Sequence, residues 1–325
     1  MFYALAIALC LAVLFLALAG SSLLFLPAML FVRRMVRTSA SENDANLLFA
    51  ARLLPAVLAV VITLGLALPA FLEFEPHSTH EGIGLRLDAL ALAGALLLTV
   101  MIARSWRMLL ATLKAQRSWR KNSQRIYLKG INLPIYCVKN SLSLLAVAGI
   151  FRAQIFLSCD VAETLSSEEL RAALGHEIAH VSSFDNLRQM LLKITRPPRW
   201  LKAFHEADAE WSGMAEIAAD QTALVRGASV LDLSSALIKI GRLSRVSVAT
   251  NAVASHLVPP TCNSSLEQRV MRLSELLQGS GQMVADSQAR PGKLMLTMFL
   301  SAVAYIACIH AFLPAIHEAL EFLVR

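Results

Sequence analysis

The run His176-Glu177-Ile178-Ala179-His180 places two imidazoles four residues apart. In an α-helix this spacing puts both rings on one face, about one turn apart, as two ligands of a single zinc ion require. Glu177 falls on the flank of that face, where its carboxylate can take a proton from water while the metal polarises a scissile carbonyl. The pattern therefore predicts metal-assisted hydrolysis of a peptide bond.

A catalytic zinc needs a third protein ligand and an open position. Glu216, in the run Glu-Ile-Ala-Ala-Asp, lies 36 residues beyond His180, which leaves room for a loop and a helix that returns across the first. The two alanines allow the helices to approach closely. Asp220, one turn after Glu216, can accept a hydrogen bond from the second ring nitrogen of a ligating histidine. We expect one Zn²⁺ per chain on His176, His180 and Glu216, although such a set also accepts cobalt or manganese.

Other residue types give weaker signals. His205 and His256 are candidates for stabilising the oxyanion of the reaction, and each also fits an ordinary surface or core histidine. The five cysteines are scattered with no C-x-x-C pair, so neither a disulfide framework nor a cysteine zinc site is indicated.

The elements around these residues have clear sequence signals. Short apolar or alternating pieces at 126–131, 134–138, 143–151 and 154–158 predict the strands of a small antiparallel sheet. Residues 165–194 predict one long helix that starts with Ser166 and Glu169 in capping-box spacing and stops before Pro197. Further helices are expected at about 214–226, 231–243 and 266–277. The HExxH helix would therefore lie between a sheet and a helical bundle.

The composition predicts a membrane protein. The chain has 325 residues, 56% of them hydrophobic and only 16% charged, which excludes a purely soluble or disordered protein. Apolar stretches long enough for a membrane span lie at about 2–32, 53–72, 90–103 and 294–316. A cleavable signal peptide competes with the first span because Ala17-Leu18-Ala19 imitates a cleavage site, but a basic segment before the apolar run is missing.

Basic residues set the expected orientation. Eight Lys and Arg and no acid lie in 104–129, whereas the segment between the second and third spans is mainly acidic. The positive-inside rule then places both termini outside and the domain after the third span in the cytoplasm. We expect three spans in 1–125, a zinc peptidase domain in 126–290, and a fourth span with a short outside tail in 291–325. The basic stretch favours contact with anionic lipid over nucleic acid.

The motifs HEIAH and EIAAD, with LSSEEL before and SSFDN after the first of them, resemble those of integral-membrane zinc metalloproteases of the gluzincin type. The four-span plan is similar to the beta-lactam sensor-transducer (BlaR-type) family. The run LEQRVMRL resembles the arginine-containing helix of the second choice, the heat-shock membrane endopeptidases and CAAX prenyl proteases. The resemblance implies zinc ligands at His176, His180 and Glu216, a catalytic base at Glu177, and supporting roles for Asp185 and Asp220. Antibiotic sensing is not expected, because no penicillin-binding domain follows the last span.

Together these features predict a mainly α membrane protein with four transmembrane helices and a cytoplasmic α+β zincin-like domain. Its expected function is a zinc endopeptidase of the cell (inner) membrane, acting on protein or peptide substrates near the bilayer. By resemblance, the strand Gln154–Ser158 would be a sheet edge that pairs with an extended substrate. Two alternatives remain open: a signalling protease specific for one regulatory partner, and a non-catalytic scaffold or assembly factor with a structural zinc site.

Overall fold

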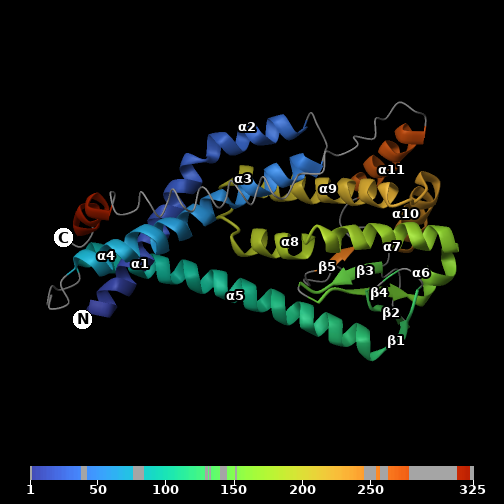
Figure 1. Ribbon diagram of the computed structural model, residues 1–325, viewed down its shortest axis with the longest axis horizontal. Helices are drawn as coiled ribbons and strands as arrows, with labels where there is room; N and C mark the ends of the chain where they lie inside the picture. Colours follow the sequence, from blue (N-terminus) through green and yellow to red (C-terminus); the bar gives the residue numbers. More distant parts are fainter. Residues whose placement is uncertain are drawn as a thin grey trace. The chain divides into compact units, whose positions relative to one another are not determined.

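The computed structural model describes residues 2–37, 42–75, 84–128, 131, 133–139, 145–150, 152–244, 254–256, 263–277 and 313–322. The chain forms two compact units. One contains Met1–Phe31, Ala51–Ile102 and Ala285–Arg325, and the other contains Val32–Ala50 and Ala103–Val284. Figure 1 labels the elements of both units.

The first unit carries the apolar helices. Three helical stretches among the described residues are long and apolar enough to cross a membrane: Phe2–Leu24, Asp44–Phe74 and Leu85–Lys121. They correspond to α1 (Phe2–Leu24), to α3 (Glu42–Val60) continued by η1 (Val61–Ala67) and α4 (Leu68–Phe74), and to α5 (Leu85–Lys121). The prediction of a membrane protein is thus supported, and most of the predicted fourth span, 294–312, lies outside the described residues.

Close packing holds α1 against its neighbours in this unit. The rings of Phe2 and Phe71 lie 5.0 Å apart between centroids. Gly94 of α5 faces the backbone carbonyl of Leu11, and a Cβ at this position would collide with it. Small residues at such crossings let helix backbones approach within the apolar phase.

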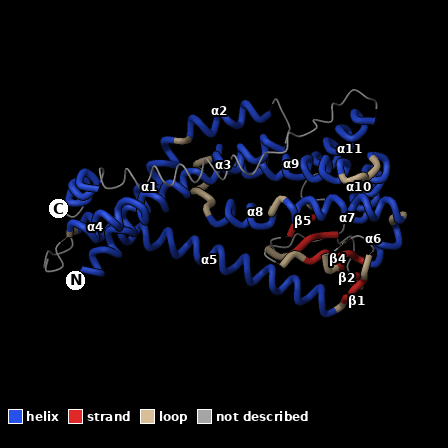
Figure 2. Tube along the Cα trace, viewed as in Figure 1, coloured by secondary structure: helices blue, strands red, loops and turns tan. Residues whose placement is uncertain are grey.

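The second unit contains a five-stranded sheet. Its strands are β1 (Ser123–Ile126), β2 (Ile135–Val138), β3 (Leu145–Ala148), β4 (Gln154–Ser158) and β5 (Ala254–His256), in the order β1-β2-β4-β3-β5. Figure 2 shows these strands in red among the helices.

The sheet is mixed, so the prediction of an antiparallel sheet was wrong. β2 and β4 are parallel, while β1–β2, β3–β4 and β3–β5 are antiparallel. The reason is the order of the strands: β4 turns back from β3 and inserts between β3 and β2, so it runs in the direction of β2. The same insertion puts β4 inside the sheet rather than at its edge. Phe156 of β4 is fully buried, and the expected role of this strand as an edge for substrate is incorrect.

Alternating strand residues build a core on each face of the sheet. Val147, Ile155 and Leu157 face one cluster that also contains Leu174 of the HExxH helix. Ala146 and Phe156 face the other cluster, where Trp119 of α5 packs on Phe156 with 5.1 Å between ring centroids. This period-2 alternation explains why the strand sequences are apolar on both sides.

Helices form the rest of the second unit, which includes the start of α3 and the part of α5 from Ala103 onward. Its other helices are α2 (Leu26–Arg37), which begins in the first unit, α6 (Cys159–Thr164), α7 (Ser167–Ser182), α8 (Asp185–Ile194), α9 (Lys202–Val225), α10 (Val230–Ser244) and α11 (Asn263–Leu277). α7 packs mainly against α9 and α10, and it also contacts β3. The helix expected at 214–226 corresponds to α9, which starts 12 residues earlier, at Lys202.

The long helix predicted at 165–194 is broken into α7 and α8. Phe184 adopts a left-handed backbone conformation with φ 56°. Among the residues that the structure describes, no other non-glycine residue has a positive φ. A left-handed residue ends an α-helix and redirects the chain. The break places Asp185 at the start of a new helix.

Candidate metal centre

Helix α7 holds His176, Glu177 and His180 in the interior of the second unit. Ser166 and Glu169 form a complete capping box at its start, since each side chain bonds to the other residue's backbone N–H. Ala173 and Leu174 anchor the apolar face in the core. The three polar side chains are 0 to 3% exposed, so the core that fixes the helix also removes them from bulk water.

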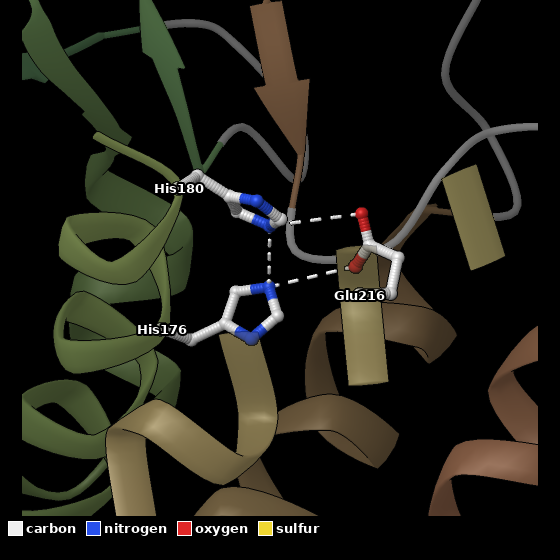
Figure 3. A group of neighbouring side chains, drawn as sticks. All are labelled: His176, His180 and Glu216. Carbon is white, nitrogen blue, oxygen red and sulfur yellow. Dashed lines mark hydrogen bonds and ion pairs between the residues drawn. The ribbon is translucent and has the colours of Figure 1, made fainter. Parts of the chain in front are cut away.

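Helix α9 brings Glu216 to the two histidines. It packs directly along α7. A Cβ placed on Gly175 of α7 would lie 3.7 Å from the Cβ of Ala223 of α9. The two Nε2 atoms of His176 and His180 lie 3.1 Å apart. The carboxylate oxygens of Glu216 lie 3.5 Å from Nε2 of His176 and 3.7 Å from Nε2 of His180. Figure 3 shows the three side chains converging on one point.

This donor set fits zinc. Ligand atoms from all three side chains lie within 4.8 Å of one another. Two donors at about 2.05 Å from a tetrahedral zinc are about 3.3 Å apart, which is close to the three separations measured here. Two imidazoles and one carboxylate are also the ligands that a hydrolytic zinc takes when its fourth position stays open.

The second ring nitrogen of each histidine meets a carboxylate. Nδ1 of His180 lies 2.7 Å from Oδ2 of Asp185, and Nδ1 of His176 lies 2.8 Å from Oδ1 of Asp220. In the neutral tautomer that donates from Nδ1, each ring directs the lone pair of Nε2 toward the shared point. The structure thus brings Asp185 and Asp220, both expected as supporting residues, to the two histidines of the cluster.

The contact between His180 and Asp185 depends on the break at Phe184. On a continuous helix, a residue five positions on would lie about 140° around the axis and would face away from His180. Because α8 starts in a new direction, the Asp185 carboxylate returns to the ring instead. The interruption is therefore part of what builds the site.

Arg269 of α11 closes the site from a third helix, and it is not among the residues that the sequence motifs predicted. Its Nη1 donates to Glu216 at 2.9 Å, and its Nε and Nη2 donate to Asp220 at 2.7 and 2.6 Å. Arg269 is 3% exposed. The available signal was its place four residues before Leu273, on the apolar face of an amphipathic helix, where a charge demands a partner.

Charge pairing dominates the electrostatics of this cluster. Burial disfavours the charged forms of Glu216 and Asp220, but Arg269 outweighs it and holds the pKa of both carboxyls below their usual range. Burial would also lower the pKa of His176, yet hydrogen bonds to Asp220 and Glu216 raise it to about 9. The cluster therefore favours positive charge at its centre, and a metal bound there displaces protons.

Glu177 lies in a different environment on the same helix. Its Oε2 accepts a hydrogen bond from the backbone N–H of Val147 in β3, at 3.1 Å. Asn186 donates to the carbonyls of Val147 and Gly149, which ties α8 to the same strand. Burial raises the pKa of Glu177 to about 7, against the lowering effect of His176 and His180. A carboxyl group of this kind is suited to exchange protons near neutral pH.

The two oxyanion candidates lie in different places. His205 is on α9, 11 residues before Glu216, which corresponds to about 16 Å along the helix. Its Nδ1 accepts from Arg196 and its Nε2 lies 3.2 Å from the carbonyl of Pro198, so the structure does not bring it to the cluster. His256 of β5 pairs through its backbone with Ala146 of β3, and its side chain lies outside what the structure describes.

Comparison with known proteins identifies a family. Residues 75–273 match the family model Peptidase_M56, described as BlaR1 peptidase M56. The match covers 199 of the 325 residues, which is more than half of the chain, and includes α7, α9 and α11 up to Leu273. No curated protein matches the chain.

Proposed function

The chain belongs to the BlaR1 peptidase M56 family of membrane metallopeptidases, and from this membership we propose that it is a zinc-dependent endopeptidase. The observation that carries the proposal is the convergence of His176, His180 and Glu216 within 4.8 Å, next to a buried Glu177 on the same helix. A site that only stabilises the fold has no use for this additional carboxylate.

The proposed mechanism assigns a role to each side chain of the cluster. Zinc, when bound to His176, His180 and Glu216, would acidify a water molecule and polarise the substrate carbonyl. Glu177, oriented by the N–H of Val147, takes a proton from the attacking water and then delivers it to the leaving amine. Asp185 and Asp220 fix the orientation of the histidine rings.

The proposal includes the side of the membrane. The active site lies on the cytoplasmic face of the cell membrane, because the basic run in 104–129 leads from α5 into the peptidase unit. Substrates are then proteins or peptides that come close to the inner surface of the bilayer. This assignment is supported by charge alone and follows the positive-inside rule.

The test compares wild type with Glu177→Gln, which keeps the shape of the side chain and an oxygen that can accept from Val147. Both proteins are purified in detergent, their zinc content is measured, and cleavage of an unfolded protein and of a membrane extract is followed. We expect about one zinc in both proteins and cleavage by wild type alone.

Other outcomes distinguish the alternatives. If both proteins bind zinc, neither cleaves any substrate, and zinc removal unfolds the peptidase unit, the scaffold interpretation is correct. Cleavage confined to one protein of the membrane extract favours a signalling protease. Equal activity of wild type and Glu177→Gln would remove Glu177 from the mechanism.

A further inference from the structure

The second unit contains a basic cavity that the metal centre does not involve. It has a volume of about 890 Å³ and is lined by α5, by the last turn of α8, by the segment that joins α8 to α9, and by the start of α9. Six of its lining residues are cations: Arg104, Arg107, Lys193, Arg196, Arg199 and Lys202. This volume lies within the range of known small-molecule sites.

The positive charge of the cavity is not balanced from within. Glu206 is the one carboxylate among its lining residues, and it pairs with Arg33 of α2. Arg33 is 6% exposed and also holds Glu210 through two hydrogen bonds of 2.8 Å. Within the described part of the chain, no carboxylate is paired with Arg107 or Lys202. The cavity therefore carries several positive charges that an anion would neutralise.

Hydrogen bonds hold the wall of the cavity in place. Arg104 donates to the backbone carbonyl of Arg196 at 2.7 Å, and Arg196 donates to Nδ1 of His205 at 3.1 Å. Pro197 and Pro198 stiffen the segment between Arg196 and His205. Burial, together with the charge of Arg196, lowers the pKa of Lys193. Like charges are thus kept close together by the fold, which costs free energy unless an anion binds.

The position along α5 relates this cavity to the bilayer surface. The apolar part of α5 ends at Ile102, and the first cation of the cavity follows two residues later. Trp106 and Trp200 flank the cations and remain 60% and 66% exposed. Tryptophan concentrates at the level of lipid headgroups, where one side of its ring is apolar and the other is wet.

We propose that this cavity binds the phosphate group of an anionic phospholipid headgroup. Arginine and lysine are the usual ligands of phosphate, and arginine can donate two parallel hydrogen bonds to its oxygens. The exposed tryptophans favour a lipid over a free phosphate compound, because a soluble ligand gains nothing from them. The proposal does not depend on the peptidase activity, since it involves no residue of the metal centre.

The experiment titrates the full-length protein in a neutral detergent with short-chain phosphatidylglycerol, short-chain phosphatidylcholine, or inorganic phosphate. Binding is followed by tryptophan fluorescence and by isothermal titration. The test variant combines Arg107→Gln, Lys193→Gln and Lys202→Gln. The matched control combines Lys114→Gln, Arg117→Gln and Lys121→Gln, which likewise removes one arginine and two lysines, all from the part of α5 outside the cavity.

We expect saturable binding of phosphatidylglycerol to wild type. Each cation near an anionic headgroup contributes roughly fivefold to the binding constant, so the test variant should bind on the order of a hundredfold more weakly and the control within about twofold. If both triple variants lose affinity equally, the overall charge attracts the lipid and no site exists. Equal binding of phosphatidylcholine, or inorganic phosphate binding as tightly as phosphatidylglycerol, would also overturn the proposal.

A second variant guards against loss of the fold. Arg199→Glu changes one exposed residue in the segment before α9 and should weaken binding of phosphatidylglycerol at least fivefold. Zinc content and the far-ultraviolet circular dichroism spectrum must match wild type in every variant. An Arg199→Glu protein that folds and still binds like wild type contradicts the assignment of the cavity.

Discussion

Removal of the carboxylate behind His180 should weaken zinc binding without unfolding the peptidase unit. Asp185 Oδ2 lies 2.7 Å from Nδ1 of His180, and the Asp185 side chain is 10% exposed. Partners of this kind typically contribute ten- to a hundredfold to metal affinity, which corresponds to about 1.4 to 2.7 kcal/mol. Because the contact is short and largely shielded from water, we expect Asp185→Ala to fall near the upper end of this range.

The series of substitutions separates charge from orientation. Asp185→Asn keeps an oxygen that can accept from Nδ1, so the ring stays oriented but loses the neighbouring negative charge. Its zinc affinity should fall by about tenfold, between those of wild type and Asp185→Ala. Asp185 also stands in the first turn of α8, where a negative charge stabilises the helix by about 0.3 to 1 kcal/mol.

A control accounts for this helix effect. Asp160 occupies the first turn of α6, is exposed, and has no contact with the metal centre among the described residues. Asp160→Ala should therefore change stability slightly and zinc affinity not at all. Affinities are measured by competition with a chelating dye in detergent, alongside circular dichroism. Zinc affinity of Asp185→Ala within twofold of wild type would refute the proposed role of Asp185.

Three further outcomes follow from buried or paired groups. Arg269→Met leaves two buried carboxylates without their cation and should lower the free energy of unfolding of the zinc-free protein by about 3 to 5 kcal/mol. This loss should shrink when zinc is added. An equal loss with and without zinc in denaturant unfolding would contradict the role of Arg269. Burial alone would raise the pKa of Glu169, but hydrogen bonds from Lys239 and other donors hold it at about 2. The charge of Glu169 therefore stabilises the fold above its usual pKa of 4.5. This contribution is lost as the pH falls from about 4.5 to about 2. Glu169→Gln should therefore lower the Tm slightly at neutral pH, by at most about 1 kcal/mol in stability, and the difference should vanish at the acidic end, which a pH series of thermal melts measures. The Sγ atoms of Cys137 and Cys159 lie 2.7 Å apart, so the oxidant diamide should join them in a disulfide that non-reducing mass spectrometry detects and that Cys137→Ser abolishes.

The donors of the metal centre were predictable because their spacing is local. His176 and His180 share a helical face wherever that helix lies, and the capping residues before them mark its start. Glu216 was found because its motif resembles a family pattern and because its distance along the chain allows a return helix. The apolar spans were predictable for a similar reason, since length and composition alone distinguish a helix that can cross a bilayer.

The sheet order was less predictable. Neighbouring strands in sequence pair in most proteins, which favours an antiparallel sheet, and the expected place of β4 at its edge came from the family resemblance. β4 instead pairs antiparallel with β3 and meets β2 in parallel on its other side. Nothing in the apolar pattern of a four- or five-residue strand specifies which of two faces or neighbours it will take.

The sequence by itself determined which groups are available: two imidazoles and a carboxylate of the types that hold zinc, a second carboxylate beside them, and apolar helices long enough for a membrane. Only the tertiary structure decided which partners these groups meet. The left-handed Phe184 brings Asp185 to His180, and Arg269 comes from a helix that lies 93 residues after His176. The cations of the basic cavity come together from α5 and from the chain between the end of α8 and the start of α9. The physical reason is that helix and strand periodicities act over a few residues, whereas contacts between distant segments depend on how whole helices pack.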